Sequence, residues 1–273
     1  MALFGKKKPE AETTQAPMMV QRECLSYQIA NLQGIGSREQ QEDAFAFANA
    51  TDVTKIQQHG LFAVVADGMG GLSGGKLASE TAVAALRDSF LQMDVFASIP
   101  DHLCRSLLEA SARVYEVLGG KGGSTAIACV FFNEKLYYAS MGDSTLFIKR
   151  NGQLFQLNTE HNVYHSRLIQ DVRCGDLSHW EESEIDQAAA VTSFLGMPNP
   201  EDIDCFKRAL PLKDGDVIML CSDGVCTLSN ACILECLCED SAQKMCEKLE
   251  QNIIAVGKRY QDNYTALVIK CEY

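Results

Sequence analysis

The sequence predicts an α+β fold in which antiparallel β-sheets are covered by helices. Strand-like runs occur in groups, and the turn signals Asn133-Glu134 and Asn151-Gly152 connect neighbouring runs as hairpins. Helical patterns are grouped between these runs and do not alternate with them, which argues against a doubly wound parallel sheet. Hydrophobic residues make up 47% of the 273 residues, enough for a sizeable core.

The strands are predicted from short apolar runs that turn residues bound on both sides. They cover residues 27–32, 44–48, 61–66, 125–132, 136–141, 145–149, 154–157, 217–222 and 265–270. Apolar residues at three- and four-residue spacing predict helices over about 74–93, 101–118 and 241–256. Ser241 is the expected N-cap of the last helix.

The segment from about 158 to 210 has a weaker pattern and predicts a surface insertion with a short helix. It contains His161, His165, His179, Trp180 and the acidic run Glu181-Glu182-Ser183-Glu184. A single histidine in such a segment is more often structural or solvated than catalytic.

Composition and charge bound the domain organisation and the function. Residues 1–24 are polar and lack periodicity, which predicts a flexible N-terminal tail, and residues 25–273 predict one domain. The net charge of −12 argues against nucleic-acid binding through a basic face. Because the chain shows neither a signal peptide nor an apolar run of the roughly 20 residues that span a membrane, we expect a cytoplasmic protein.

The 12 cysteines are expected to be reduced thiols. Most lie inside apolar runs, as Cys129 and Cys221 do, where cysteine packs as a small hydrophobic residue. The cysteines between positions 232 and 246 lack the paired C-x₂-C spacing of zinc sites and fall in a helical pattern, which disfavours zinc.

Asp67-Gly68-Met69-Gly70-Gly71 is the most informative stretch of the chain, and it follows the apolar run 61–66. An ionised carboxylate at the end of a buried strand is costly unless a charge is paired with it. The glycines allow a sharp turn and bring a backbone carbonyl close to whatever the aspartate holds. A bound cation explains this pattern, and an ordinary Asp-Gly turn is the alternative.

Other carboxylates also lie beside strand-like runs. Asp223-Gly224 follows the run 217–222, Asp262-Asn263 precedes the run 265–270, and Glu42-Asp43 precedes the run 44–48. Hard cations such as Mg²⁺ and Mn²⁺ take oxygen ligands of this kind. The carboxylates together therefore predict a centre for divalent cations.

In these residues the chain resembles the metal-dependent protein serine/threonine phosphatases, the protein phosphatase 2C or PPM family, in its short bacterial form. The matching motifs occur in the family's order over about 27–270. They are Gly36-x-Arg38-x₃-Glu42-Asp43-Ala44, Val65-Ala66-Asp67-Gly68-Met69-Gly70-Gly71-x₂-Gly74-Gly75, Gly123-Ser124-Thr125-Ala126, Ala139-x-x-Gly142-Asp143-Ser144, Gly215-Asp216 through Asp223-Gly224, and Asp262-Asn263-x-Thr265. The resemblance implies a four-layer α/β/β/α sandwich with two central antiparallel β-sheets flanked by helix pairs.

The resemblance also implies two Mn²⁺ or Mg²⁺ ions. Asp67 would bridge them, Gly68 would supply a backbone carbonyl to one, and Asp223 and Asp262 would complete the other. A metal-bridging hydroxide would then attack the phosphorus atom of phosphoserine or phosphothreonine.

The remaining roles follow from the same resemblance. Glu42 and Asp43 would hold metal-bound waters, and Arg38 would bind the substrate phosphate, which its planar guanidinium matches in geometry. The alternative for Arg38 is a surface ion pair with Glu39 or Glu42.

Two positions depart from the family's pattern. Some relatives have a histidine at the position of Met69, where it protonates the leaving group, and a methionine cannot donate that proton. Asp143 resembles a ligand of a third, weaker metal ion, but Thr227 stands where an acidic partner is usual. A cap of the turn between two strands is the alternative role for Asp143. Ser124 and Thr125 are expected to serve strand packing.

We therefore expect a metal-dependent protein serine/threonine phosphatase. The alternative is a catalytically degenerate module with the same fold that binds a signalling partner. The resemblance implies phosphorylated proteins as substrates and a cognate Ser/Thr kinase. We also expect the chain to be a monomer.

Overall fold

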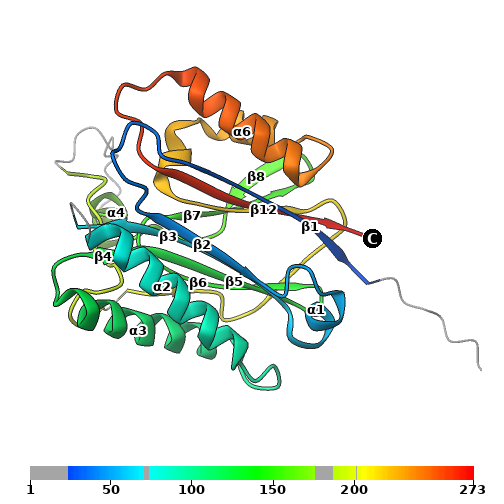
Figure 1. Cartoon of the computed structure of the whole chain (residues 1–273), viewed down its shortest axis with the longest axis horizontal. Helices are drawn as coiled ribbons and strands as arrows, with labels where there is room; N and C mark the ends of the chain where they lie inside the picture. The colour runs from blue at the N-terminus through cyan, green and yellow to red at the C-terminus, as the bar shows by residue number, and fades with distance from the viewer. Residues whose placement is uncertain (1–23, 71–73, 176–186, 201) are drawn as a thin grey trace, which may run out of the picture.

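Two antiparallel β-sheets packed face to face form the centre of the computed structural model (Figure 1), as the sequence predicts. The structure describes residues 24–70, 74–175, 187–200 and 202–273. The predicted tail lies outside the described residues, except for Cys24. The same is true of Gly71, His179, Trp180 and the acidic run 181–184.

The first sheet has the strand order β1-β12-β11-β7-β8, and the second has the order β10-β6-β5-β3-β2. The first consists of β1 (Ser26–Gly34), β12 (Tyr264–Glu272), β11 (Val217–Cys221), β7 (Thr145–Arg150) and β8 (Gln153–Gln156). The second consists of β10 (Leu210–Pro211), β6 (Lys135–Met141), β5 (Ala126–Phe132), β3 (Leu61–Met69) and β2 (Asp43–Ala48). The short strands β4 (Gly123–Ser124) and β9 (Asp204–Cys205) pair with β3 and β6.

Helices cover the outer face of each sheet and complete the expected four layers (Figure 1). The helices α2 (Gly74–Leu91) and α3 (Ile99–Leu118) pack on the second sheet. The helices α5 (Asn230–Cys236) and α6 (Ala242–Val256) pack on the first. The Ser241 side chain accepts a hydrogen bond from the backbone N–H of Lys244, which confirms the predicted N-cap of α6.

Strand β3 shows why its sequence is apolar without alternation. Phe62, Val64 and Ala66 face the helices, whereas Leu61 and its alternate neighbours face the core between the two sheets. Both faces of β3 are therefore buried, a situation more common in parallel sheets, and every position benefits from an apolar side chain.

Both predicted hairpins are confirmed, because β5 pairs with β6 and β7 pairs with β8. Asn133 and Glu134 at the first turn, and Asn151 and Gly152 at the second, all have positive φ, as type I′ turns require. The predicted helix ranges leave out three short helical elements: α1 (Val53–His59), α5 and the 3₁₀ helix η2 (Asp223–Thr227). Each is too short to show a helical period in the sequence.

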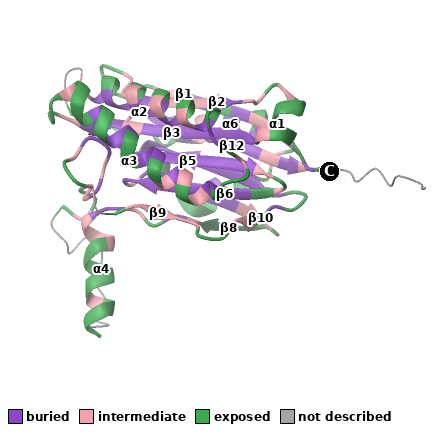
Figure 2. Cartoon of the chain, turned by 90° about the horizontal axis from the view of Figure 1, so that it is seen from below, coloured by how far each residue is buried: buried purple, intermediate pink, exposed green. Residues whose placement is uncertain are grey.

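The segment that follows β8 contains the predicted short helix, α4 (Val163–Cys174). Figure 2 shows α4 extending away from the layered body, and none of its residues is buried. In the part of the chain that the structure describes, no helix is long and apolar enough to cross a membrane.

Candidate active site

One cavity of about 450 Å³ at an edge of the two sheets collects almost all of the predicted site residues. Five carboxylate side chains line it together with the Arg38 guanidinium, although they come from five separate parts of the chain. The lining residues are Arg38, Glu42, Asp67, Gly68, Met69, Gly70, Thr125, Asp143, Ala189, Ala190, Val191, Asp223, Asp262 and Asn263. Only Asp43 among the predicted residues does not line the cavity, and it is buried.

The backbone of Asp67 is held on both sides, which fixes the direction of its side chain. Asp67 N–H donates to Thr125 Oγ1 at 3.0 Å, and the Asp67 carbonyl accepts from Thr125 N at 2.8 Å and Ser124 Oγ at 2.9 Å. Thr125 Oγ1 also shares a hydrogen bond with Ser144 Oγ at 2.7 Å. Ser124 and Thr125, expected to serve strand packing, therefore position Asp67.

Glycine is required at position 68 because the backbone passes very close to its neighbours there. A Cβ atom on Gly68 would lie 2.1 Å from the Gly75 carbonyl oxygen and 2.7 Å from the Glu42 carbonyl oxygen. Gly68 N–H donates to that Glu42 oxygen at 3.2 Å, and Asn263 Oδ1 accepts from Glu42 N at 2.8 Å. These contacts join the start of β2 to the end of β3 and fix where the Glu42 side chain leaves the backbone.

Asp43 connects the two sheets beneath the cavity. Its Oδ2 accepts hydrogen bonds from Ser222 Oγ and Thr265 Oγ1, both at 2.7 Å, across the space between β2 and the other sheet. Its Oδ1 is buried and has no hydrogen-bond partner among the described residues. A buried carboxylate oxygen without a donor is costly, so this oxygen is suited to a water or a cation.

Burial first, and the charges of neighbouring carboxylates second, raise the pKa of three aspartates at the site. Burial raises the pKa of Asp67 well above its ordinary value, and the charges of Asp43 and Asp223 raise it further. Burial, followed by the charge of Asp223, raises the pKa of Asp143 to about 7. Burial likewise raises the pKa of Asp43 to about 6, although two hydrogen bonds oppose the change. A divalent cation would relieve this repulsion.

Arg38 forms an ion pair with Asp262, with Nη2 and Oδ2 2.5 Å apart. The ion pair expected as the alternative was with Glu39 or Glu42, but the partner of Arg38 in the structure is Asp262. Ser37 N and Ser37 Oγ both donate to the Gln261 carbonyl, at 2.8 and 2.9 Å, and so hold the two loops together. The Arg38 side chain is 56% exposed, so it is free to turn toward a ligand in the cavity.

The carboxylates face one cavity without converging on one point. Over the described ranges, no three acidic, histidine or cysteine side chains lie close enough together to hold an ion as they stand. The ion pair between Arg38 and Asp262 explains part of this, because it directs the Asp262 carboxylate, a predicted metal ligand, toward the Arg38 guanidinium. The oxygen donors are of the type that Mg²⁺ and Mn²⁺ prefer, and the unpaired Asp43 oxygen fits the same chemistry.

The surroundings of Asp143 contain residues that no sequence motif connects with the site. Gly142 N–H donates to His161 Nδ1 at 3.0 Å, and His161 N–H donates to the Gly142 carbonyl at 2.9 Å. His161 therefore fixes the turn that presents Asp143, a structural role of the kind expected for a histidine in this segment. The charge of Glu160 also contributes to the raised pKa of Asp143.

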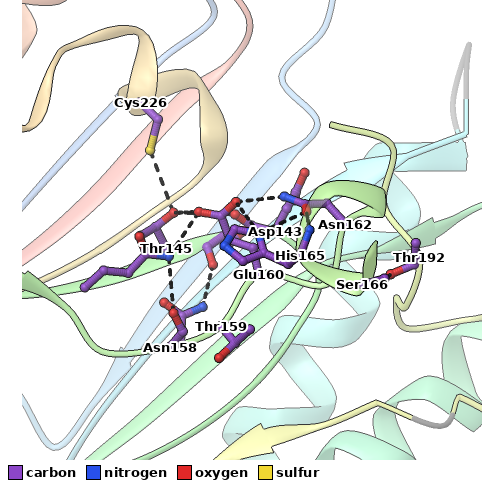
Figure 3. Close-up of polar contacts among 12 residues, drawn as sticks. Asp143, Thr145, Asn158, Thr159, Glu160, Asn162, His165, Ser166, Thr192 and Cys226 are labelled. Carbon is purple, nitrogen blue, oxygen red and sulfur yellow. Dashed lines mark hydrogen bonds and ion pairs between the residues drawn. The ribbon is translucent and has the colours of Figure 1, made fainter. Parts of the chain in front are cut away.

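Figure 3 shows Glu160 among several polar side chains close to Asp143. Glu160 Oε1 accepts from Thr145 Oγ1 at 3.4 Å, and Glu160 Oε2 accepts from Asn162 Nδ2 at 2.9 Å. The acidic neighbour of Asp143 thus comes from the segment after β8 and not from position 227. Thr145 and Glu160 are 15 residues apart in the chain, and Glu160 comes close to Asp143 only when this segment folds back, so no short motif connects Glu160 with the site.

Comparisons with known proteins agree with this arrangement. Residues 35–256 match the family described as protein phosphatase 2C. The serine/threonine phosphatase stp of Listeria welshimeri is 26% identical over 217 residues, which cover 76% of this chain and 83% of that protein. The crystal structure of the PPM Ser-Thr phosphatase MsPP from Mycobacterium smegmatis, in complex with cacodylate, is 27% identical, with a TM-score of 0.71 over 89% of this chain and 97% of that one.

A structure with the same fold contains metal. The catalytic domain of the serine threonine protein phosphatase PstP, in complex with 2 manganese ions, superposes with a TM-score of 0.69 at 23% identity, over 92% of this chain and 100% of that one. This likeness shows the shared fold. The family match spans most of the chain, so the chain belongs to the protein phosphatase 2C family.

Proposed function

We propose that this chain is a metal-dependent protein phosphatase that hydrolyses phosphoserine and phosphothreonine in protein substrates at the acidic cavity. The observation that carries the proposal is the gathering of five carboxylates and one arginine, from segments up to 224 residues apart, around 450 Å³ of space. Family membership and the serine/threonine phosphatases among the relatives support the same activity. The alternative, a degenerate binding module, is not favoured, because every predicted principal ligand is retained.

We assign the metal ligands as the resemblance implies. The Asp67 carboxylate and the Gly68 carbonyl, together with Asp223 and Asp262, would hold two Mn²⁺ or Mg²⁺ ions. Two such ions would supply a nucleophile from water at neutral pH and would offset the charge of a phosphate dianion. Glu42 and Asp43 would hold waters, and the Asp43 oxygen without a partner suits that role.

Arg38 would bind the phosphate oxygens. It must first leave Asp262, and an exposed ion pair is weak enough to be exchanged for a bidentate contact with a phosphate. Met69 lines the cavity but has no proton to donate. We therefore assign protonation of the leaving serine or threonine oxygen to water.

A third, weaker ion would lie at Asp143. Glu160 is the nearby carboxylate that would share it, in place of the acidic residue that Thr227 replaces. We further propose that the chain acts as a monomer in the cytoplasm, on phosphoproteins that a cognate Ser/Thr kinase produces.

The proposal is tested by assaying the purified chain against p-nitrophenyl phosphate and a phosphothreonine peptide with Mn²⁺, Mg²⁺ or a chelator. We expect hydrolysis only with metal, and Asp67→Ala should lower it by at least about 10³-fold because a bridging ligand is lost. The matched control is Asp88→Ala, an exposed aspartate at the far end of α2. Normal metal binding without hydrolysis, or near-normal turnover by Asp67→Ala, would contradict the assignment.

A further inference from the structure

Two half-buried thiols meet where α3 passes β9, away from the acidic cavity. Cys104 lies on α3 and Cys205 on β9, and their sulfur atoms are 3.1 Å apart although 101 residues separate them in the sequence. Cys104 Sγ donates its hydrogen toward Cys205 Sγ. Both thiols are partly accessible, in contrast to Cys129 and Cys271, which are buried in the core.

The two sulfur atoms are held in this position by well-packed elements. Leu103 and Leu107 anchor α3 in the core against the second sheet. Cys205 is paired with Ala139 of β6, the strand beneath α3. A disulfide bond is about 2.0 Å long, so the sulfurs need to approach by about 1 Å, a movement that side-chain rotation supplies.

The local chemistry distinguishes the two thiols. Burial, followed by the hydrogen bond to Cys205, raises the pKa of Cys104 to about 12. Cys104 therefore keeps its proton at neutral pH and donates it to the sulfur of Cys205. This arrangement suits Cys205 as the sulfur that attacks an oxidant and Cys104 as the sulfur that resolves the product.

We propose that Cys104 and Cys205 are a site of reversible oxidation, closed to a disulfide by hydroperoxides and reopened by thiol reductants. In the first step the Cys205 thiolate attacks a peroxide oxygen, the O–O bond breaks, and hydroxide leaves to form water, giving a sulfenic acid. Cys104 sulfur then attacks Cys205 sulfur, the S–O bond breaks, and a second water leaves with the Cys104 proton. The two sulfurs lose two electrons, which the peroxide accepts.

The position of this pair connects it to the wall of the acidic cavity. Asp204, next to Cys205, accepts from Thr159 N at 2.7 Å and Tyr138 OH at 2.9 Å. The chain between Thr159 and Asp204 supplies Val191 and its neighbours to the cavity. Strand β9 lies at the end of this segment and also binds its beginning, through the contact between Asp204 and Thr159. The disulfide would fasten this anchor to α3 with a covalent bond.

The test uses the reduced full-length chain, treated with hydrogen peroxide in a chelator, blocked with iodoacetamide and digested without reduction. We expect one cross-linked peptide that contains Cys104 and Cys205, with two hydrogens fewer than the separate peptides. Because the bond closes a loop of 101 residues, the Tm should rise by about 5–10 °C and return after dithiothreitol.

Variants make the test specific. Cys104→Ser and Cys205→Ser should abolish the cross-link and the rise in Tm, while Cys232→Ser, which changes a half-buried thiol on α5, should keep both. If iodoacetamide alkylates both Cys104 and Cys205 after a peroxide treatment that oxidises other thiols, the two stayed reduced, and the proposal would be overturned. Cross-links between other cysteines in place of the one between Cys104 and Cys205, or sulfinic acid at Cys205 without a cross-link in the native chain, would overturn it as well.

Discussion

Replacing Asp43 by asparagine tests whether the buried carboxylates destabilise the metal-free fold. Asp43 is only 5% exposed, and burial, the largest cause, raises its pKa from 3.8 to about 6. A carboxyl whose pKa is raised by folding stabilises the fold while it is protonated, fully so below about pH 4. That stability is lost as the pH rises through about 6, so the metal-free chain should weaken between these values.

The size of the effect follows from the same pKa. Each pKa unit corresponds to about 1.4 kcal/mol, so ionisation of Asp43 should lower the free energy of unfolding by about 3 kcal/mol at pH 8. Asparagine has no charge to lose, and its amide oxygen can still accept from Ser222 and Thr265. Between pH 4 and pH 8, the stability of Asp43→Asn should therefore fall by about 3 kcal/mol less than that of the wild type.

Urea unfolding in a chelator, repeated at several pH values, measures this difference directly. Comparing each protein with itself across pH removes the constant cost of placing an amide NH₂ at the buried Oδ1 position. Asp88→Asn, on the exposed end of α2, is the control and should follow the wild type. Saturating Mn²⁺ at pH 8 should stabilise the wild type, because the cation offsets the carboxylate charge. The same pH dependence for wild type and Asp43→Asn in chelator would show that Asp43 does not titrate with a raised pKa in the folded chain.

Three further predictions follow from the cavity. Gly68→Ala should destabilise the chain by at least about 3 kcal/mol, measured by urea unfolding, because its Cβ would meet the Gly75 carbonyl at 2.1 Å; an unchanged midpoint would contradict the close approach. Arg38→Ala should lower kcat/KM for a phosphopeptide by about 10–100-fold while the fold stays intact, because a charged contact with the phosphate is lost. Arg87→Ala, which changes an exposed arginine on α2, is the control, and an equal loss there would count against a phosphate contact at Arg38. Thr227→Asp should tighten the weakest Mn²⁺ site in a calorimetric titration, and an unchanged titration would argue against a third ion at Asp143.

Much of the fold could be predicted because its signals are local. The turn at Asn133-Glu134 predicts a hairpin from two residues, and the apolar runs before Asp67 and Asp223 predict strands that end in a carboxylate. The short helix α1 and the bounds of α5 could not be predicted, because seven residues show too little of a helical period.

The support around the site could not be predicted for a different reason. Ser222 and Asp43 are 179 residues apart, and their hydrogen bond exists only because the two sheets pack face to face. Thr125, His161 and Glu160 likewise acquire their roles from segments that meet in the folded chain. No spacing rule connects such residues in the sequence.

Residue types alone identify the chemical groups that this protein brings to its site: hard oxygen donors at strand ends, an arginine for an anion, and no proton donor at Met69. How these groups are held depends on the folded chain. Asp43 is buried under two hydroxyl donors, Arg38 is paired with Asp262, and Glu160 stands near Asp143. The physical reason is that residue type sets the chemistry, whereas burial, partner and pKa depend on which distant segments the packing of the sheets brings into contact.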